Sequence, residues 1–324
     1  MNNEFILSCQ NKILAGGNIN KDEASKLINI PNYLLHNLSK SANKITREIH
    51  GKKIDVEQLT NIKKNKCSED CSFCSQSAFF DTDVNNYDFL SENEIMRQAK
   101  KAFDEGAESY CLVAAWKQPS SNNFTKICDI ISKIKQKYPI DIECSLGFLT
   151  LEQAKKLKQI GVKRYNHNLE TSRTKFPEIC TTHTYEDRIK TIKIVKLAGL
   201  ELCTGGILGL GETRTQRLEL ILDVAFFVPE EVTINLLVPI LGTPLEYQSQ
   251  LSIDEVLRVF AVTRFLLPNS IIKISGGREF NLFDDGEKLL LSGANGIISS
   301  GYLTLEGNDT NKDVKMIKKI GLET

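Results

Sequence analysis

Apolar and polar residues alternate along most of this chain in a repeated unit. From Lys52 onward, helical stretches end in glycine, and two to five residues later a short run rich in apolar and β-branched residues begins. Eight such runs predict strands near residues 60–66, 110–115, 140–146, 165–170, 200–208, 232–238, 271–275 and 296–300. Helices are predicted between them, for example at residues 91–105, 150–160, 185–198 and 254–267.

These eight alternations predict an α/β protein built on a closed (β/α)8 TIM-type barrel. An open doubly wound sheet is the alternative, because a count of strands does not prove closure. The first part of the chain instead carries apolar positions at irregular helical spacing. We therefore expect an N-terminal helical cap over residues 1–50 and the barrel over residues 51–324.

Strand phase predicts which side chains enter the barrel, because successive side chains of a strand point to opposite faces. Positions that face the helices should be apolar, so the polar members of each alternation should point inward. The predicted inward residues are Asp141, Glu143, Ser145, Asn166, Asn168, Glu170, Glu201, Cys203, Thr233, Asn235, Lys273 and Ser275. So many amides and charges indicate a polar ligand at the carboxyl ends of the strands. His167 falls on the helix-facing side and is expected to be a buried core histidine.

The charge balance narrows the class of ligand. Lysine plus arginine total 41 and aspartate plus glutamate also total 41 among 324 residues, so no net field favours nucleic acid or an anionic membrane. We therefore expect a small diffusible substrate. The apolar run 5–7 is too short for a signal peptide and no stretch reaches transmembrane length, which predicts a cytoplasmic protein.

Cysteine spacing singles out one loop. Cys67, Cys71 and Cys74 form a C-x3-C-x2-C motif after the first predicted strand, whereas the other six of the nine cysteines are dispersed, as in a reducing compartment. Such a loop can bring three thiolates to three irons of a cubane [4Fe–4S] cluster, and the fourth iron stays open because no further cysteine is near in sequence. Zinc is the alternative, although a structural zinc site normally has four ligands and the nearest histidines lie in the N-terminal region.

At this motif, which has Phe73 before its last cysteine, the chain resembles the radical S-adenosylmethionine superfamily. In that superfamily the open iron is chelated by S-adenosylmethionine. Further segments are similar to signatures of the biotin synthase family, and in this order they cover nearly the whole chain. They are residues 111–116, 165–172, 181–188, 203–212, 242–245 and 275–279.

The resemblance implies a radical sulfurtransferase reaction. A reduced cluster on the three motif cysteines would cleave S-adenosylmethionine, and the resulting 5′-deoxyadenosyl radical would remove hydrogen from dethiobiotin before sulfur from an auxiliary iron–sulfur cluster is inserted. The resemblance implies that Asn168 and Asn235 bind the ureido ring of dethiobiotin, and that Asn168, Glu170 and Arg188 line the S-adenosylmethionine site, with Glu170 at the ribose. It assigns no catalytic role to a protein side chain. It also implies an electron donor such as flavodoxin or ferredoxin, and a homodimer.

The glycine-rich segment 205–211 has two interpretations. Its order, G-G-x-x-G-x-G, is not the G-x-G-x-x-G fingerprint of dinucleotide-binding proteins. The structural interpretation is a tight turn between a strand and a helix. The functional interpretation, which we prefer because Cys203 flanks the segment, is a close approach of the backbone to S-adenosylmethionine.

The auxiliary cluster is where the sequence departs from the family. The resemblance implies a [2Fe–2S] cluster on three cysteines and one arginine, and only Cys111 and Cys203 match. Glu143 stands in place of the third cysteine, with Cys144 one residue late, and Lys273 stands in place of the arginine. Three explanations are open: a variant cluster with non-cysteine ligands, which we favour, a third thiolate from Cys180, or no auxiliary cluster. A one-residue bulge that turns Cys144 inward is a less favoured alternative.

Three rival functions are also compatible with these residues. The first is a related radical enzyme of the hydrogenase-maturation or methylornithine-synthase kind, acting on another small molecule. The second is a non-enzymatic iron–sulfur carrier or redox sensor, which leaves the inward polar residues without a purpose. The third is a zinc-stabilised binding module.

Overall fold

The strands of the protein form one parallel sheet that closes on itself. The structure is a computed structural model that describes residues 2–304 and 307–324. Its strands are β1 Asp55–Lys63, β2 Ser109–Ala114, β3 Asp141–Ser145, β4 Val162–Asn166, β5 Glu201–Cys203, β6 Gly206–Leu208, β7 Glu231–Leu236, β8 Ile271–Ile274 and β9 Gly296–Ser299. They pair in the order β5-β4-β3-β2-β1-β9-β8-β7-β6, and a further pairing of β5 with β7 closes the barrel.

β5 and β6 are two parts of one interrupted strand. Cys203 of β5 lies in register with Glu231 of β7, and Gly206 of β6 lies in register with Ile234 of the same strand. Counted in this way, the barrel has eight strands, so the predicted (β/α)8 barrel is confirmed and the open doubly wound sheet is wrong. The first strand begins at Asp55, five residues earlier than the sequence pattern predicts, and this shift matters for the site below.

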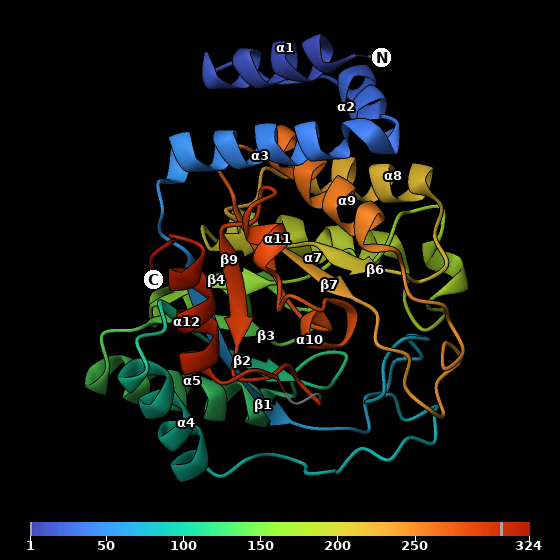
Figure 1. The fold of residues 1–324 in the computed structure, drawn as a ribbon. Coiled ribbons are helices and arrows are strands. Elements are labelled where there is room, and N and C mark those ends of the chain that lie inside the picture. Colours follow the sequence, from blue (N-terminus) through green and yellow to red (C-terminus); the bar gives the residue numbers. More distant parts are fainter. Residues whose placement is uncertain (1, 305–306) are drawn as a thin grey trace.

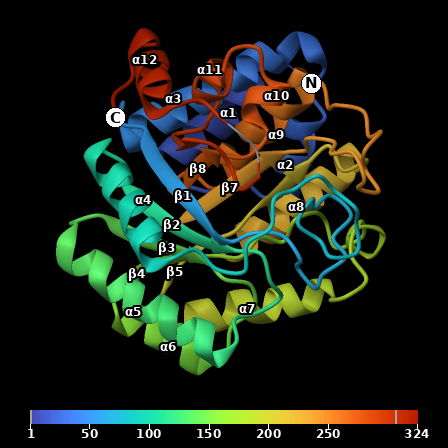
Figure 2. The ribbon, with the colours of Figure 1, turned by 90° about the horizontal axis from the view of Figure 1, so that it is seen from below.

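Helices surround the strands, as Figure 2 shows for α4 to α7 in the view from below. The helices of the barrel are α4 Glu92–Asp104, α5 Ser121–Lys137, α6 Leu151–Gln159, α7 Tyr185–Leu197, α8 Arg214–Phe226, α9 Ile253–Leu266, α10 Arg278–Asn281, α11 Glu287–Leu290 and α12 Thr310–Lys319. Serine or threonine caps the first turn of α4 to α9 by accepting a backbone N–H. Three of these, Thr150, Thr184 and Thr213, form complete capping boxes.

An N-terminal helical cap covers one end of the barrel (Figure 1). It consists of α1 Asn3–Leu14, α2 Lys21–Ile28, the short 3-10 helix Asn32–Leu34 and α3 Leu35–His50. In α3, Thr46 Oγ1 donates to the carbonyl of Gly293 at 3.2 Å and Arg47 Nη2 donates to the carbonyl of Ala294 at 3.3 Å. Because these carbonyls precede β9, the cap lies at the amino ends of the strands and leaves the carboxyl ends free for a ligand.

The hydrophobic core lies between the strands and the helices. Tyr165, Leu202, Val232 and Ile272 have at most 1% of their surface exposed and belong to this core, as strand phase predicts. Cys144 belongs to the same apolar cluster and faces away from the barrel interior. The predicted alternation of polar inward and apolar outward residues therefore describes the observed strands.

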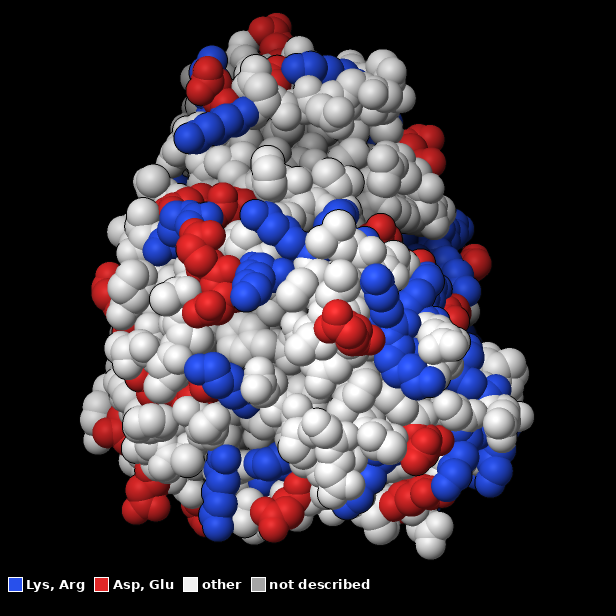
Figure 3. Space-filling model, turned by 180° about the vertical axis from the view of Figure 1, so that it is seen from behind, with Lys and Arg blue, Asp and Glu red and all other residues white. Residues whose placement is uncertain are grey.

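Figure 3 shows one outer face of the molecule, on which basic and acidic side chains are scattered among uncharged ones. Equal totals of 41 cationic and 41 anionic residues accompany this mixture. Among the described residues, no helix combines the length and apolar character that crossing a membrane requires.

Candidate active site

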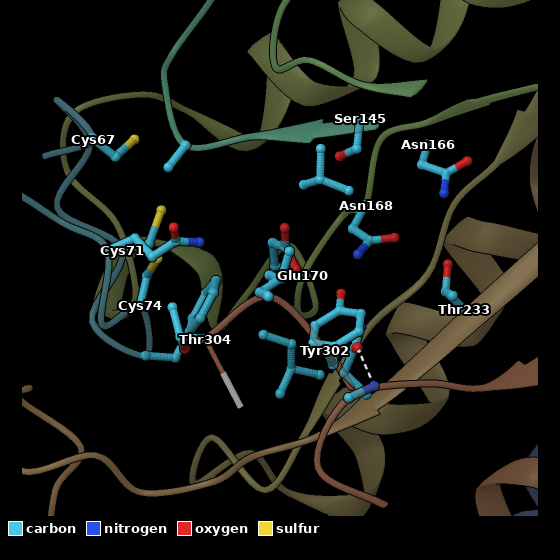
Figure 4. Close-up of a pocket in the computed structure, with 18 of the residues that line it drawn as sticks. Cys67, Cys71, Cys74, Ser145, Asn166, Asn168, Glu170, Thr233, Tyr302 and Thr304 are labelled. Atoms are coloured by element: carbon cyan, nitrogen blue, oxygen red, sulfur yellow. Dashed lines mark hydrogen bonds between the residues drawn. The ribbon is translucent and has the colours of Figure 1, made fainter. Parts of the chain in front are cut away.

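A cavity of about 300 Å³ opens at the carboxyl ends of the strands. Figure 4 shows Cys67, Cys71 and Cys74 at one end of it. The polar side chains of Ser145, Asn166 and Thr233 lie toward the other end (Figure 4). The cavity therefore joins the cysteine motif to the polar residues that strand phase placed inside the barrel.

The cysteine loop is anchored by hydrogen bonds of the main chain. Cys67 N donates to the carbonyl of Gln76 at 2.8 Å, and Cys74 N donates to the carbonyl of Cys71 at 2.9 Å. The side chain of Gln76 accepts from Asn61 Nδ2 of β1 at 2.8 Å, which ties the loop to the barrel. All three thiols of the motif line the cavity.

These thiols are neutral without a metal. Burial raises the pKa of Cys67, and it raises the pKa of Cys74 to about 12. A hydrogen bond to Cys180, together with burial, raises the pKa of Cys71. A metal that takes these three sulfurs must displace their protons, which suits iron or zinc and no hard cation.

A second group of polar side chains lies behind Cys71. Cys180 Sγ is 3.8 Å from Cys71 Sγ and 3.2 Å from His183 Nδ1, and Glu69 holds the same histidine nitrogen in a short contact. In the metal-free protein the hydrogen bonds from Cys71 and His183 lower the pKa of Cys180 to about 4. The structure does not support Cys180 as the third auxiliary thiolate, because the sulfur of Cys180 lies beside the motif loop.

The same group bears on the zinc alternative. Cys71, Cys180 and His183 each offer a ligand atom within 4.8 Å of the others. A zinc ion there would use one motif cysteine and leave Cys67 and Cys74 without a role, although both face the cavity. The geometry therefore favours a larger metal group held by all three motif cysteines.

The residues predicted to bind S-adenosylmethionine meet on one wall of the cavity. Arg188 Nη1 donates to the carbonyl of Asn168 at 2.9 Å and lies 3.3 Å from Glu170 Oε1. Burial raises the pKa of Glu170, and the charge of Arg188 opposes this effect. Asn168 Oδ1 is buried and has no hydrogen-bond partner among the described residues, so it is available to a ligand.

Asn235 lines the cavity from β7, but its amide is already engaged. Its Oδ1 accepts from Gly276 N at 2.9 Å, and its Nδ2 donates to the carbonyl of Gly206 at 3.4 Å. One amide hydrogen and one lone pair are therefore free for a ligand. The two asparagines differ in this respect, since Asn168 has its oxygen unpaired.

Sequence reasoning missed part of the wall. Tyr302 and Thr304 lie in the loop after β9 and line the cavity, and no periodic pattern marks that loop. The one sequence signal for this part of the wall is the glycine at position 276, because a Cβ there would lie 2.4 Å from the ring of Tyr302. Burial raises the pKa of the Tyr302 hydroxyl.

Two expectations need correction. His167 is buried, as expected, but it borders the cavity, because β4 ends at Asn166 and strict alternation stops there. In the glycine-rich segment, a Cβ at Gly205 would lie 1.9 Å from the carbonyl oxygen of Thr233, and a Cβ at Gly206 would lie 2.5 Å from the carbonyl oxygen of Glu170. Close packing against the backbone of Thr233 and Glu170 therefore requires these two glycines. Within the segment, Ile207 is the residue that lines the cavity.

Below the cavity, charged side chains from several strands form a buried layer, which we call the charged layer. It consists of Asp55, Glu57, Glu143, Arg164, Glu201, Glu231 and Lys273. Lys273 Nζ lies 2.8 Å from Glu57 Oε2 and 2.6 Å from Glu231 Oε2. Arg164 Nη1 lies 2.7 Å from a carboxylate oxygen of Glu143 and 2.7 Å from one of Glu231.

The centre of the charged layer has one more acid than it has bases. Glu57, Glu143 and Glu231 have fully buried side chains, and they face the two cations Arg164 and Lys273. Burial raises the pKa of Glu57 to about 8 and also raises that of Glu231. Burial opposes the charge of Lys273, but the surrounding carboxylates outweigh it and raise the pKa of this lysine well above its usual range.

Cys111 and Cys203 adjoin the charged layer. Cys111 lies in register with Glu143, and its Sγ accepts from Asn166 Nδ2 at 3.7 Å. Cys203 Sγ lies 2.8 Å from Thr233 Oγ1. Pairing between β2 and β3 is regular through Glu143, so no bulge turns Cys144 inward.

Two known families match the chain. Residues 61–224 match the Radical SAM superfamily, and residues 233–323 match the Biotin and Thiamin Synthesis associated domain. A biotin synthase of Nitrosopumilus maritimus is 63% identical over 321 residues, which cover 99% of this chain and 98% of the relative. A biotin synthase of Clostridium botulinum is 40% identical over 318 residues, which cover 98% of this chain and 99% of that relative.

Solved structures share the fold at low sequence identity. The crystal structure of methylornithine synthase is 19% identical, with a TM-score of 0.85 over 97% of this chain and 96% of that one. The crystal structure of HydG, a maturase of the [FeFe]-hydrogenase, is 19% identical, with a TM-score of 0.86 over 99% of this chain and 76% of that one. These likenesses concern the barrel and its N-terminal cap.

Proposed function

The chain belongs to the biotin synthase family of the radical SAM superfamily, and we propose that it inserts sulfur into dethiobiotin to form biotin. Membership rests on relatives that match nearly the whole chain. The observation that carries the proposal in the structure is one cavity that joins three motif thiols to buried amides without full hydrogen bonding.

As a radical SAM enzyme, the protein uses a [4Fe–4S] cluster and S-adenosylmethionine. Cys67, Cys71 and Cys74 fit the cluster, since all three residues line the cavity and come from one loop. When bound, the cluster supplies the electron that cleaves S-adenosylmethionine and so yields a radical able to remove hydrogen from an unactivated carbon.

The chain's own residues bind and orient the two small molecules. We propose that Glu170 accepts hydrogen bonds from ribose hydroxyls. Arg188 lies 3.3 Å from Glu170 Oε1 and donates to the backbone carbonyl of Asn168, and these contacts support the position of both residues. Apolar residues such as Phe73, Trp116 and Leu237 line the same cavity and exclude water from it. Exclusion of water and fixed orientation are what radical chemistry requires from the protein.

The ureido ring of dethiobiotin offers two N–H donors and one carbonyl acceptor. Asn168 Oδ1 can accept one N–H, and the free amide hydrogen of Asn235 can donate to the carbonyl. The two amides come from the segment that follows β4 and from β7, so a ring between them would meet polar groups from two walls. This complementarity supports dethiobiotin as the substrate.

The four-ligand set of the family's auxiliary cluster does not fit this chain. Lys273 stands at the arginine position, and its ammonium lies within 2.9 Å of carboxylates of Asp55, Glu57 and Glu231, so it has no lone pair to offer. Three donors remain: the thiols of Cys111 and Cys203, and Glu143 Oε2, which is buried and unpaired among the described residues. We propose that these three residues hold an auxiliary iron–sulfur cluster of variant composition.

The proposal extends to partners and compartment on the strength of the family. We propose a flavodoxin or ferredoxin as electron donor, a homodimer, and a location in the cytoplasm. All nine cysteines are unpaired, which is consistent with a reducing compartment.

Turnover under anaerobic conditions tests the function. Protein reconstituted with iron and sulfide should convert dethiobiotin to biotin and form deoxyadenosine and methionine when S-adenosylmethionine and a strong reductant are present. Deoxyadenosine formation without biotin would indicate a related radical reaction on another small molecule. Failure to cleave S-adenosylmethionine would contradict the proposed radical reaction altogether.

Iron and sulfide analysis with Mössbauer spectra tests the auxiliary cluster separately. Cys111→Ala and Cys203→Ala should lose the iron and sulfide of one cluster and keep the iron of the other. Glu143→Gln should weaken auxiliary binding without changing the first cluster. Wild-type protein with the iron content of a single cluster would overturn the auxiliary site.

A further inference from the structure

A buried ion pair outside the cavity holds one of the loops that form the cavity wall. Arg278 is the first residue of α10 and directly follows Gly276 and Gly277, which line the cavity. Asp313 lies on α12, and its carboxylate accepts two hydrogen bonds from Arg278: Nη1 donates to Oδ1 at 2.8 Å, and Nη2 donates to Oδ2 at 2.9 Å. Neither side chain has more than 1% of its surface exposed. Neither is among the described residues that line the cavity.

The same carboxylate also holds the loop after β9. Ser299 is the last residue of β9, and its Oγ donates to Asp313 Oδ2 at 2.6 Å. Arg278 Nη2 lies 3.5 Å from the carbonyl oxygen of Ile298, a residue that lines the cavity. Tyr302 follows Ser299 by three residues and lines the cavity as well. Helix α12 therefore joins two loops that are separate in the sequence.

The loop after β9 depends on such contacts because part of its backbone is strained. Ser300 has a φ of 66° and Leu303 a φ of 54°, which lie in the left-handed region that residues with a Cβ rarely adopt. Conformations of this kind persist only where the surrounding structure fixes them. Tyr302 lies between these two residues. A second contact with α12 supports the loop, since Thr310 Oγ1 lies 3.0 Å from Ser300 Oγ.

The two loops meet at the part of the cavity that contains Asn235. Gly276 N donates to Asn235 Oδ1 at 2.9 Å, and a Cβ at Gly276 would lie 2.4 Å from the ring of Tyr302. Figure 4 shows this ring toward the end of the cavity that Thr233 lines, away from Cys67. A shift of either loop would therefore change the space that a ligand finds between Tyr302 and Asn235.

Geometry is what a buried ion pair of this kind supplies best. Taking two charges out of water offsets much of the attraction between them, so a buried pair is weak evidence for stability. The planar fork of an arginine, however, fixes both the distance and the angle to a carboxylate. Both oxygens of Asp313 accept hydrogen bonds within the protein, so this carboxylate acts on a ligand through the loops that it holds.

We propose that Asp313 is a positioning residue: it acts through Arg278 to hold the wall that carries Tyr302, and it thereby sets the affinity for dethiobiotin. The inference rests on the proposed function, because it takes dethiobiotin as the ligand of this part of the cavity. Binding of S-adenosylmethionine should not depend on Asp313, since Glu170 and Arg188 come from the segment after β4 and from α7.

Binding measured apart from turnover tests the inference. Equilibrium dialysis of anaerobic holoprotein without reductant gives the Kd for S-adenosylmethionine, and then the Kd for dethiobiotin in its presence. Asp313→Asn should raise the Kd for dethiobiotin about tenfold, the equivalent of one hydrogen bond to the ligand. The Kd for S-adenosylmethionine should equal that of the wild type.

Arg258→Met is the matched control for the loss of a buried ion pair. Arg258 is a fully buried arginine like Arg278, but it contacts the N-terminal cap, where it donates to the carbonyl of Ile30 at 2.8 Å and to Asn32 Oδ1 at 2.7 Å. Asp313→Asn and Arg258→Met should both lower the midpoint of urea unfolding, and only Asp313→Asn should weaken dethiobiotin binding. Equal Kd values for dethiobiotin in the two variants would overturn the inference.

A double-mutant cycle tests whether Asp313 acts on the ligand through Tyr302. Tyr302→Ala should weaken dethiobiotin binding by itself. Addition of Asp313→Asn should then raise the Kd little further, because the side chain that Asp313 positions is already absent. Additive changes in the free energy of dethiobiotin binding would overturn the inference.

Arg278→Lys keeps the test decisive if Asp313→Asn does not fold. This variant retains the buried positive charge and loses the planar fork, so it should fold and raise the Kd for dethiobiotin. The wild-type Kd in Arg278→Lys would overturn the inference and leave the proposed function intact. Wild-type protein that does not bind dethiobiotin would instead contradict the proposed function, and the inference with it.

Discussion

The two groups of cysteines around the cavity have opposite surroundings. Cys67, Cys71 and Cys74 lie on one loop and line the cavity. Cys111 and Cys203 come from two strands and adjoin the charged layer, in which buried carboxylates share the cations Arg164 and Lys273. The loop is therefore a preformed ligand set that follows from local sequence, whereas the strand thiols depend on charges that the barrel brings together.

The two regions should also differ in how they respond to amino-acid substitutions. A loop with backbone donors tolerates substitution of its neighbours, because its geometry is set by main-chain hydrogen bonds. In the charged layer, removal of one member leaves others buried without partners, which is expensive in a low-dielectric interior. Substitutions in the first region should thus change chemistry, and those in the second should change stability.

Loss of one motif thiol should give the largest effect. In Cys71→Ala, deoxyadenosine formation should fall to the background of reductant alone, a loss of at least about 10³-fold, because the ligands act as a unit. Chromatography of the anaerobic reaction measures it, with Cys128→Ala as the control. Deoxyadenosine formation at the wild-type rate would contradict the assignment of the motif cysteines as the ligands of the cluster.

Removal of the central cation should change stability by the next largest amount. Lys273→Met leaves Glu57, Glu231 and Asp55 with one cation fewer, and we expect the free energy of unfolding to fall by about 3–5 kcal/mol. Urea unfolding measures the change. Lys163→Met is the control, since its pair with Asp141 is 41% and 44% exposed and should contribute under about 1 kcal/mol. Equal effects of the two substitutions would refute the distinction between a buried layer and a surface pair.

The two asparagines between these regions should separate binding from stability. Asn168→Ala removes an oxygen that has no partner among the described residues, so the KM for dethiobiotin or S-adenosylmethionine should rise about tenfold, the equivalent of one hydrogen bond. Its free energy of unfolding should fall by less than about 1 kcal/mol, because the side chain interacts with the protein through a hydrogen bond to Glu170. Asn235→Ala also removes the bonds to Gly276 and Gly206, so it should lower stability by about 1–3 kcal/mol as well. Steady-state kinetics and urea unfolding of both variants would show whether this division holds.

The most gradual expected effect is the pH dependence of stability that arises in the charged layer. Glu57 faces Lys273, Glu143 and Glu231, and burial raises its pKa from 4.5 to about 8. The folded protein therefore keeps this proton at a pH where the unfolded chain has lost it. The contribution to stability is fully present below about pH 4.5 and is lost as the pH rises to about 8.

Glu57→Gln should flatten this profile by up to about 1 kcal/mol per pH unit, because one buried acid no longer titrates. Urea unfolding between pH 5.5 and 8 measures the slope for both proteins. Glu4→Gln is the control, since this carboxylate lies on α1 in the N-terminal cap, away from the charged layer. An unchanged slope in Glu57→Gln would mean that the layer carries no proton beyond those of its two cations.

Much of the site could be read from the sequence, because the signals are local. The three motif cysteines fall within eight residues, and strand phase is a rule about neighbours, so Glu143, Thr233 and Lys273 were placed on the inward face correctly. The sequence pattern does not predict inward positions for Glu57, Arg164 and Glu231, because β1, β4 and β7 begin before the apolar runs that indicate these strands. The sequence pattern does not predict Tyr302 as a site residue, because the loop after β9 has no periodic pattern.

The sequence by itself determined the barrel, the ligand loop and the family, since each depends on residues close together or on a pattern repeated along the chain. Only the tertiary structure decided which charges meet and which thiols become neighbours. Lys273 reaches carboxylates on β1 and β7, and Cys180 reaches Cys71, because the closed sheet and its loops bring distant segments within bonding distance. Coulombic and hydrogen-bond partners depend on separation in space, and no rule based on neighbours along a strand contains that separation.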